Sequence, residues 1–260
     1  MFKKKNEIFD IFLLILFPVL SVIISLLFKT SYLISILLFY GLPALWLSMR
    51  HSKKIKKVVI FSFLTTVPMG LMMDYIGTLN QSWFVPNSLL SFRFFNLIPF
   101  EDFVWFFVIT YAIVIFYESF FNKDNRVRNK NVVKFVLVVF FILLIFFIIL
   151  FFKSNLFIFS NAYLWLAIFF FVVPTIFFVF LVDRKIMRKF LITAFYFFMI
   201  TIIFEAVALN LEQWIFPGEY MFPTFNLAGC RFPFEELFFV AIGGPFFALF
   251  FYEFLVDDKK

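Results

Sequence analysis

The 260-residue chain has 64% hydrophobic side chains, a mean hydropathy of +1.03 and a formal net charge of +7. Soluble domains contain roughly 45 to 50% apolar residues, so this composition excludes a water-soluble protein. The single cysteine, Cys230, excludes intrachain disulfides and cysteine-based metal clusters. The positive charge lies in short clusters without a soluble module, which argues against nucleic-acid binding.

Eight apolar runs come close to the roughly 20 residues that an α-helix needs to cross the hydrocarbon of a bilayer. They cover Ile8 to Phe28, Tyr32 to Met49, Val58 to Gly77, Phe100 to Phe120, Val132 to Phe152, Ala162 to Leu181, Phe190 to Leu209 and Phe234 to Val256. The runs are apolar throughout, whereas the strands of a membrane barrel alternate. The sequence therefore predicts an all-α integral membrane protein with about eight transmembrane helices.

Lys and Arg are unevenly distributed between the predicted loops. All but four of the 23 fall at the two termini or in the loops near residues 50–57, 123–134 and 184–189. The four exceptions are Lys29, Arg93, Lys153 and Arg231. Short loops rich in Lys and Arg stay in the cytoplasm. We expect a multi-pass protein of the inner (cytoplasmic) membrane with both termini in the cytoplasm.

The sequence contains an internal repeat. Four residues recur 131 positions later: Pro43, Asp74, Trp83 and Pro86 as Pro174, Glu205, Trp214 and Pro217. After three inserted residues, Pro99-Phe100-Glu101-Asp102 recurs as Pro233-Phe234-Glu235-Glu236, and Phe116-Tyr117-Glu118 recurs as Phe251-Tyr252-Glu253. Residues 1–128 and 129–260 are then two repeats of four transmembrane helices. An even number of spans makes the repeats parallel, with equivalent motifs at the same leaflet.

Acidic residues within the apolar runs are the candidate catalytic groups, because ionisable groups in a membrane are costly and usually functional. They are Asp74, Glu101, Asp102, Glu205, Glu235 and Glu236. In each half, one acid lies about one turn inside the non-cytoplasmic end of a helix, and two more open the next helix. Two structural roles are the alternative: a buried hydrogen bond between helices, or stabilisation of the dipole of a helix.

Aromatic side chains accompany these acids and are the candidate substrate-binding residues. They are Trp83, Trp105, Phe106, Trp214, Phe238 and Phe239. Helical i,i+4 spacing places Trp105 on the face of Glu101 and Phe106 on that of Asp102. Acids beside ring faces suit proton-driven chemistry on an alkene, in which a carboxyl donates a proton, the rings stabilise a carbocation and a carboxylate removes a proton. Such a reaction needs no cofactor and no metal.

Two further pairs of charged residues have bland interpretations. Glu118 and Glu253 lie at the cytoplasmic ends of helices near basic loops, where we expect them to form ion pairs. Arg93 and Arg231 each precede an acidic motif on the side that is poor in positive charge. They either pair with the motif carboxylates or contact lipid headgroups.

The acid, the tryptophan nine residues later and the Pro-Phe-acid-acid motif resemble the pattern of the lycopene cyclase domain family. This family comprises membrane carotenoid cyclases built as two small subunits or as one fused chain, and the resemblance covers both halves. It implies a redox-neutral, acid-initiated cyclisation of the linear ψ-ends of lycopene to β-rings. It also implies no flavin, and entry of the substrate from the bilayer. Membrane lipids and other carotenoid-pathway enzymes are the expected partners.

Other functions fit parts of the same pattern. The substrate could be a different polyprenoid, acted on by a cyclase, a hydratase or another enzyme. A proton-coupled transporter also uses intramembrane carboxylates, although none of these acids lies near the midplane. A scaffold of duplicated helices is a third alternative. The spacing leaves open which acid donates the proton, and whether the halves build one composite site or two.

Overall fold

The structure is a computed structural model that describes residues 2–51, 54–121, 130–173, 175–176, 184–227, 229–237 and 242–255. The first half contains α1 (Phe2–Phe28), α2 (Tyr32–Ile36), α3 (Leu42–Arg50), α4 (Ile55–Leu79) and α5 (Phe100–Phe120). The second contains α6 (Lys130–Phe152), α7 (Ala162–Ala167), α9 (Arg184–Asn210), α10 (Phe234–Glu236) and α11 (Gly244–Leu255). The chain is therefore a helical protein, as the apolar runs predict.

Five helical segments within the described part of the chain are long and apolar enough to span a membrane. They are Glu7–Phe28, Tyr32–Arg50, Ile55–Leu79, Phe100–Phe120 and Arg184–Asn210. These segments confirm the prediction of an all-α membrane protein. The fifth predicted run coincides with α6, whereas the sixth and eighth runs include residues outside the described ranges. The expectation of eight spans stays a prediction.

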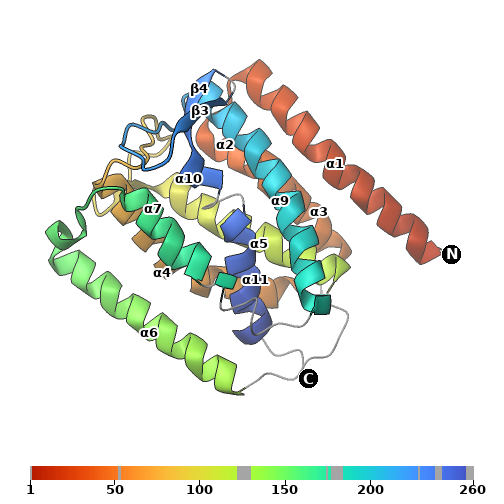
Figure 1. The fold of residues 1–260 in the computed structure, drawn as a ribbon. Helices are drawn as coiled ribbons and strands as arrows, with labels where there is room; N and C mark the ends of the chain where they lie inside the picture. Colours follow the sequence, from red (N-terminus) through yellow and green to blue (C-terminus); the bar gives the residue numbers. More distant parts are fainter. Residues whose placement is uncertain are drawn as a thin grey trace.

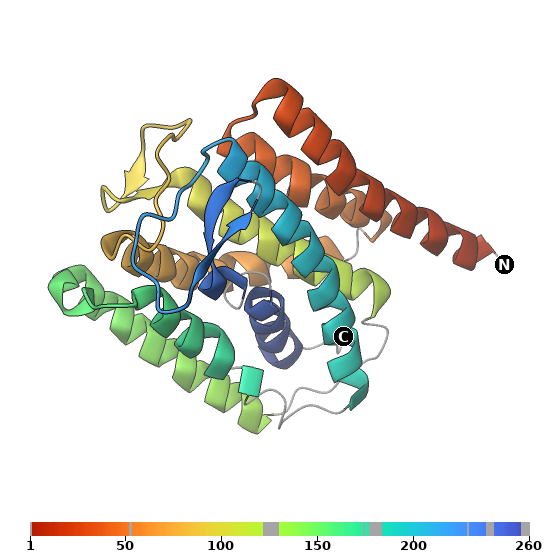
Figure 2. The same cartoon turned by 45° about the horizontal axis from the view of Figure 1, so that its top comes forward.

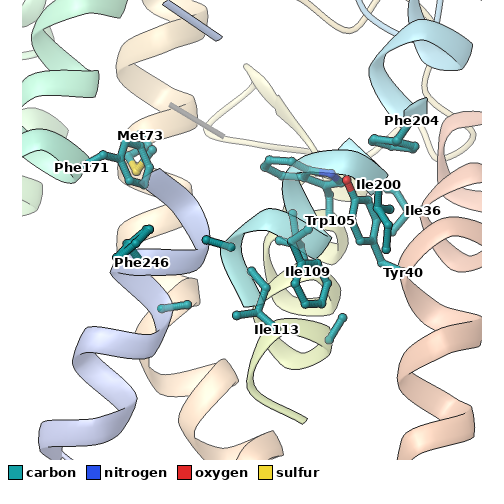
Figure 3. Close-up of a cluster of buried hydrophobic side chains, with 14 of the residues drawn as sticks. Ile36, Tyr40, Met73, Trp105, Ile109, Ile113, Phe171, Ile200, Phe204 and Phe246 are labelled. Carbon is teal, nitrogen blue, oxygen red and sulfur yellow. The ribbon is translucent and has the colours of Figure 1, made fainter. Parts of the chain in front are cut away.

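The long helices form a bundle in which α5 and α11 lie in the middle and α1 and α6 lie on opposite flanks (Figures 1 and 2). The core between the helices consists almost entirely of aliphatic and aromatic side chains. Figure 3 shows part of it, where Trp105, Ile109 and Ile113 of α5 lie between Met73 on one side and Tyr40 on the other. The exposed apolar side chains of α1 and α6 are those expected of helices that face lipid.

Two π-helical turns occupy equivalent places, η1 (Leu37–Gly41) between α2 and α3 and η4 (Ile168–Val172) after α7. A proline lacks the backbone N–H that would bond four residues back, and its ring clashes with the carbonyl at that position. In the first half, Pro43 directly follows η1, so a widened turn relieves that clash. Pro174, its counterpart, lies outside the described residues.

Both α4 and α9 end in a left-handed residue that reverses the chain. Gln81 (φ 56°) and Glu212 (φ 52°) occupy this position. The next amides bond back into the last turn, Ser82 N–H to the Gly77 carbonyl at 2.8 Å and Gln213 N–H to the Ala208 carbonyl at 2.9 Å. This is the Schellman type of helix end. It folds Trp83 and Trp214 back over their helices.

A short antiparallel hairpin precedes the acidic motif in each half. The first pairs β1 (Arg93–Phe94) with β2 (Ile98–Pro99), and the second pairs β3 (Thr224–Leu227) with β4 (Cys230–Pro233). Both hairpins lie at one end of the bundle (Figure 2). The apolar pattern of the sequence did not predict them, because they lie in loops. Each ends on the proline that caps the following helix in extended conformation.

Reciprocal contacts join the two halves at both ends of the bundle. At the hairpin end, Phe84 and Ile215 exchange two backbone hydrogen bonds, of 3.0 and 2.9 Å. At the other end, the Tyr117 hydroxyl donates to Glu253 at 2.9 Å, and the Tyr252 hydroxyl donates to Glu118. In each case a residue bonds the sequence counterpart of its partner. Such contacts are typical of two units related by a twofold axis.

Candidate functional site

A cavity near the hairpin end of the bundle gathers acids from both halves of the chain. About 460 Å³ of space free of protein atoms, part of it open to the surroundings, is lined by four of the six predicted catalytic residues: Asp74, Asp102, Glu205 and Glu236. We call this space the acid cavity. All four side chains are buried, with 1 to 4% of their surface exposed. No Lys or Arg is among the described residues that line it.

Two of the acids are held by the tryptophan nine residues later. The Trp83 indole N–H donates to Asp74 Oδ1 at 2.9 Å, and the Trp214 indole N–H donates to Glu205 Oε2 at 3.0 Å. The helix ends described above make these bonds, because they return each tryptophan to the last turns of its own helix. The sequence prediction that these tryptophans and acids belong to one site is consistent with this geometry.

Two tyrosines complete the link between the halves. The Tyr32 ring packs edge-on against Trp214, with centroids 5.0 Å apart, and Tyr163 packs against Trp83 at the same distance. Tyr163 follows Tyr32 by the same 131 residues that separate Asp74 from Glu205. Each tryptophan therefore bonds the acid of its own half and contacts the tyrosine of the other half. The cavity lies where the two halves meet.

Asp74 and Asp102 approach each other within the cavity. Their carboxyls interact electrostatically, and the Tyr32 hydroxyl lies beside Asp102. One oxygen of each, Asp74 Oδ2 and Asp102 Oδ2, is buried and has no hydrogen-bond partner among the described residues. A buried carboxylate oxygen without a partner is costly in a protein interior, so an unpaired oxygen beside a cavity is suited to a substrate or a proton.

Glu101 and Glu235 do not line the acid cavity. Glu101 Oε1 accepts hydrogen bonds from the backbone N–H groups of Leu89 at 2.6 Å and Leu90 at 3.3 Å. Glu235 Oε1 accepts from Met221 N–H at 2.8 Å and Phe222 N–H at 3.1 Å, in the equivalent loop. In both halves, therefore, the first acid of the motif anchors the preceding loop and the second faces the cavity. The predicted catalytic role of Glu101 and Glu235 stays a prediction.

Most of the predicted aromatic residues also line the acid cavity. Trp105 and Phe106 join Trp83 and Trp214 there. Trp105 and Phe106 stack edge-on with centroids 4.7 Å apart, and the Trp105 indole N–H is buried without a partner among the described residues. Phe238 and Phe239 lie outside the described residues. Trp105 faces the cavity, although Glu101, four residues before it, does not.

The two arginines near the motifs bind backbone and ring groups. The Arg93 guanidinium donates to the carbonyl oxygens of Leu97 at 2.9 Å and Val85 at 3.0 Å, and so closes the first hairpin. Arg231 lies over the Tyr220 ring, 5.1 Å from its centroid. Burial raises the pKa of the Tyr220 hydroxyl above its usual value, and the charge of Arg231 lowers it in part.

The sequence reasoning missed four residues that line the acid cavity: Tyr32, Tyr163, Val85 and Phe216. All four obey the repeat, because Val85 and Phe216 are also separated by 131 residues. A comparison of the two halves residue by residue would have found them. Attention to charged groups in apolar runs did not, because tyrosine and valine are ordinary in such runs.

No protein-family model, curated protein or solved structure matches this chain.

Proposed function

We propose that this membrane protein catalyses a redox-neutral, acid-initiated cyclisation of a linear polyprenoid, with lycopene and its ψ-ends as the leading substrate. The observation that carries the proposal is the acid cavity, where four buried carboxyls and several aromatic rings meet. The resemblance to the lycopene cyclase domain family supports the same chemistry. The reaction would be that of an intramolecular lyase or isomerase in carotenoid biosynthesis.

We also propose that the chain consists of two parallel repeats of four spans, with both termini in the cytoplasm. Three observations support a twofold axis along the membrane normal: the Phe84–Ile215 pairing, the reciprocal Tyr–Glu bonds at the other end, and the paired Tyr–Trp contacts. Five pairs of equivalent residues line the acid cavity, which therefore lies on this axis. The two halves then build one composite site rather than two.

The proposed reaction needs only proton transfers. A protonated carboxyl gives its proton to the terminal alkene of the substrate, which forms a C–H bond and a tertiary carbocation. The π electrons of a second alkene attack the cation and close a six-membered ring. A carboxylate then removes a proton beside the new cation, and the ring alkene forms. One proton enters and one leaves, so the product is an isomer of the substrate and no oxidant or reductant takes part.

The residues of the acid cavity divide these tasks in the proposal. Asp74 and Asp102 lie close together with an unpaired oxygen each, so they are suited to share and donate the proton. Glu205 and Glu236 approach from the other half and are the candidate bases. The ring faces of Trp83 and Trp214 stabilise the positive charge between the two groups of acids. Glu101 and Glu235 hold the loops that close the cavity.

The test is expression of the chain in bacteria that produce lycopene, followed by chromatography of the pigments. Wild-type protein should convert lycopene to products with one or two β-rings. The variants Asp102→Asn and Glu236→Gln should lower that yield roughly 10²- to 10⁴-fold, as expected on loss of a general acid or base. Glu253→Gln is the matched control, because Glu253 lies at the opposite end of the bundle.

Two results would overturn the proposal. Lycopene left unchanged by a well-folded wild-type protein would exclude lycopene as the substrate and direct the search to other polyprenoids. Full activity in both Asp102→Asn and Glu236→Gln would show that the acid cavity is not the site of the chemistry.

A further inference from the structure

A second cavity adjoins the acid cavity deeper in the bundle. It contains about 650 Å³ of space free of protein atoms and lies between α4, α5, η4 and α11. Trp105 and Phe106 line both cavities and form the neck between them. We call the second space the apolar cavity, because its described lining consists of apolar side chains and glycines apart from Thr65 and Thr110.

The apolar cavity is long as well as apolar. Along α4 its lining extends from Met73, next to Asp74, down to Phe61. At 1.5 Å per residue, Phe61 and Asp74 are roughly 20 Å apart along the helix axis. That distance is about two-thirds of the hydrocarbon thickness of a bilayer. The two cavities together therefore form an elongated space with acids at one end.

The lining of the apolar cavity is interior rather than lipid-facing. Met69, Met73, Phe171, Ala248 and Phe251 each expose less than a tenth of their surface. Thr65 turns its hydroxyl away from any ligand and donates to the Phe61 carbonyl of its own helix at 2.7 Å. Methionines form adaptable walls, because their side chains are unbranched and flexible. These properties suit a long, flexible apolar chain.

The equivalent region of the other half is filled. The counterparts of Gly70, Met73 and Phe171 are Thr201, Phe204 and Tyr40, each separated by 131 residues. The Tyr40 hydroxyl bonds Thr201 at 3.1 Å, and the Tyr40 ring packs on Phe204 with centroids 5.1 Å apart. Figure 3 shows this packed group on one side of α5, with Met73 beside Phe171 on the other side. The smaller or more flexible residues leave space on one side of the molecule.

We propose that the apolar cavity holds the hydrocarbon chain of the substrate whose end reacts in the acid cavity. The proposal rests on the proposed function and adds where the substrate lies and how its length is measured. Gly70 sets the position of the neck, because a Cβ at this residue would come within 2.7 Å of the Phe106 ring. The substrate is accordingly bound by one end only, and a molecule with two reactive ends must leave and return in reverse.

The test fills the apolar cavity without touching an acid. Ala248→Leu on α11 and Thr110→Leu on α5 are the two filling variants, and both residues are buried in its wall. Ala194→Leu is the matched control, because Ala194 lines a separate groove on α9 that also has room for a larger side chain. The use of two filling variants keeps the test valid if one of them fails to fold.

Binding is measured with squalene, a linear isoprenoid hydrocarbon, as the amount retained by purified protein in lipid nanodiscs. Both filling variants should weaken squalene binding by about tenfold or more, the effect of a side chain that occupies the site. Ala194→Leu and Glu236→Gln should bind squalene like the wild type. In the pigment assay, the filling variants should lose activity on lycopene but keep activity on a shorter acyclic polyprene with the same terminal alkene.

The outcomes distinguish this inference from the proposed function. Unchanged squalene binding and unchanged lycopene cyclisation in both filling variants would overturn the inference and leave the cyclase proposal intact. A phospholipid acyl chain that squalene cannot displace would also overturn it and assign the cavity to lipid. Weaker squalene binding in the filling variants, with no cyclisation even by the wild type, would support the chain-binding cavity and refute the cyclase.

Discussion

The contact between Gly77 and Trp83 can be tested by a single methyl group. A Cβ at residue 77 would lie 2.2 Å from the Trp83 ring, whereas ordinary contacts begin at 3.4 Å. The ring would have to move by more than 1 Å. The hydrogen bond from Trp83 to Asp74, now 2.9 Å long, would then exceed normal hydrogen-bond length. Gly77→Ala should therefore detach the tryptophan from the acid.

The expected cost follows from two opposing effects. Loss of a hydrogen bond to a buried group costs about 1 to 3 kcal/mol, and overpacking adds a similar amount. Alanine regains roughly 0.5 to 1 kcal/mol, because it is the better helix former. We expect Gly77→Ala to lower the free energy of unfolding by about 1 to 3 kcal/mol. Gly41→Ala is the control, since a Cβ there meets Leu37 at an acceptable 3.4 Å.

The second half of the chain indicates how the defect could be repaired. There the counterpart of Gly77 is Ala208, the acid is Glu205, and the tryptophan still bonds it at 3.0 Å. Glutamate is one methylene longer than aspartate, so the tryptophan can bond it from further away and leave room for a Cβ. The double variant Gly77→Ala/Asp74→Glu should therefore be more stable than Gly77→Ala alone.

Thermal unfolding in detergent, analysed as a double-mutant cycle, measures this coupling. The expected result is a favourable coupling energy between residues 77 and 74. If Gly77→Ala is as stable as Gly41→Ala, or if Asp74→Glu does not improve it, then the reasoning from the Trp83 contact is refuted.

Two further predictions concern the ends of the acidic helices. Glu118→Ala should destabilise the protein by about 2 kcal/mol or more in detergent unfolding, because the fully buried Glu118 carboxylate binds Lys54 and Lys57 at 3.0 Å each, and both lysines are partly exposed to solvent; a change below 0.5 kcal/mol would contradict this. Glu101→Gln should speed hydrogen exchange of the Leu89 amide by about tenfold, whereas the neighbouring Asp102→Asn should leave that amide protected; equal effects of the two variants would refute the division of the motif into an anchor and a cavity acid.

The membrane class and most of the site could be predicted from the sequence, because lipid leaves few choices. A helix is needed wherever a long apolar run occurs, so α1, α4, α5 and α9 lie close to their predicted runs. An acid in such a run has few tolerable environments, so Asp74 and Glu205 were identifiable as site residues. The repeat placed them at one leaflet.

The direction of each side chain could not be predicted in the same way. Glu101 and Asp102 are adjacent, and both the dipole argument and the catalytic argument apply equally to either residue. Only the loop that returns over the helix decides which one receives backbone hydrogen bonds. The hairpins escaped prediction for a related reason, since their short strands carry no apolar periodicity. The same is true of η1, whose widened turn needs the position of Pro43 as well as its presence.

The divergence between the halves is explained by a single site on the axis that relates them. The reacting end of a linear polyprenoid has no twofold symmetry, so Asp102 and Glu236 must meet different atoms of one substrate. Two identical halves would offer the same acid and the same cavity on both sides. A fused chain lets each side change alone: one kept Gly70 and Met73 beside a cavity, and the other acquired Thr201 and a filled core. On this argument, exchange of Asp102 and Glu236 should impair cyclisation although the number of carboxyls is unchanged.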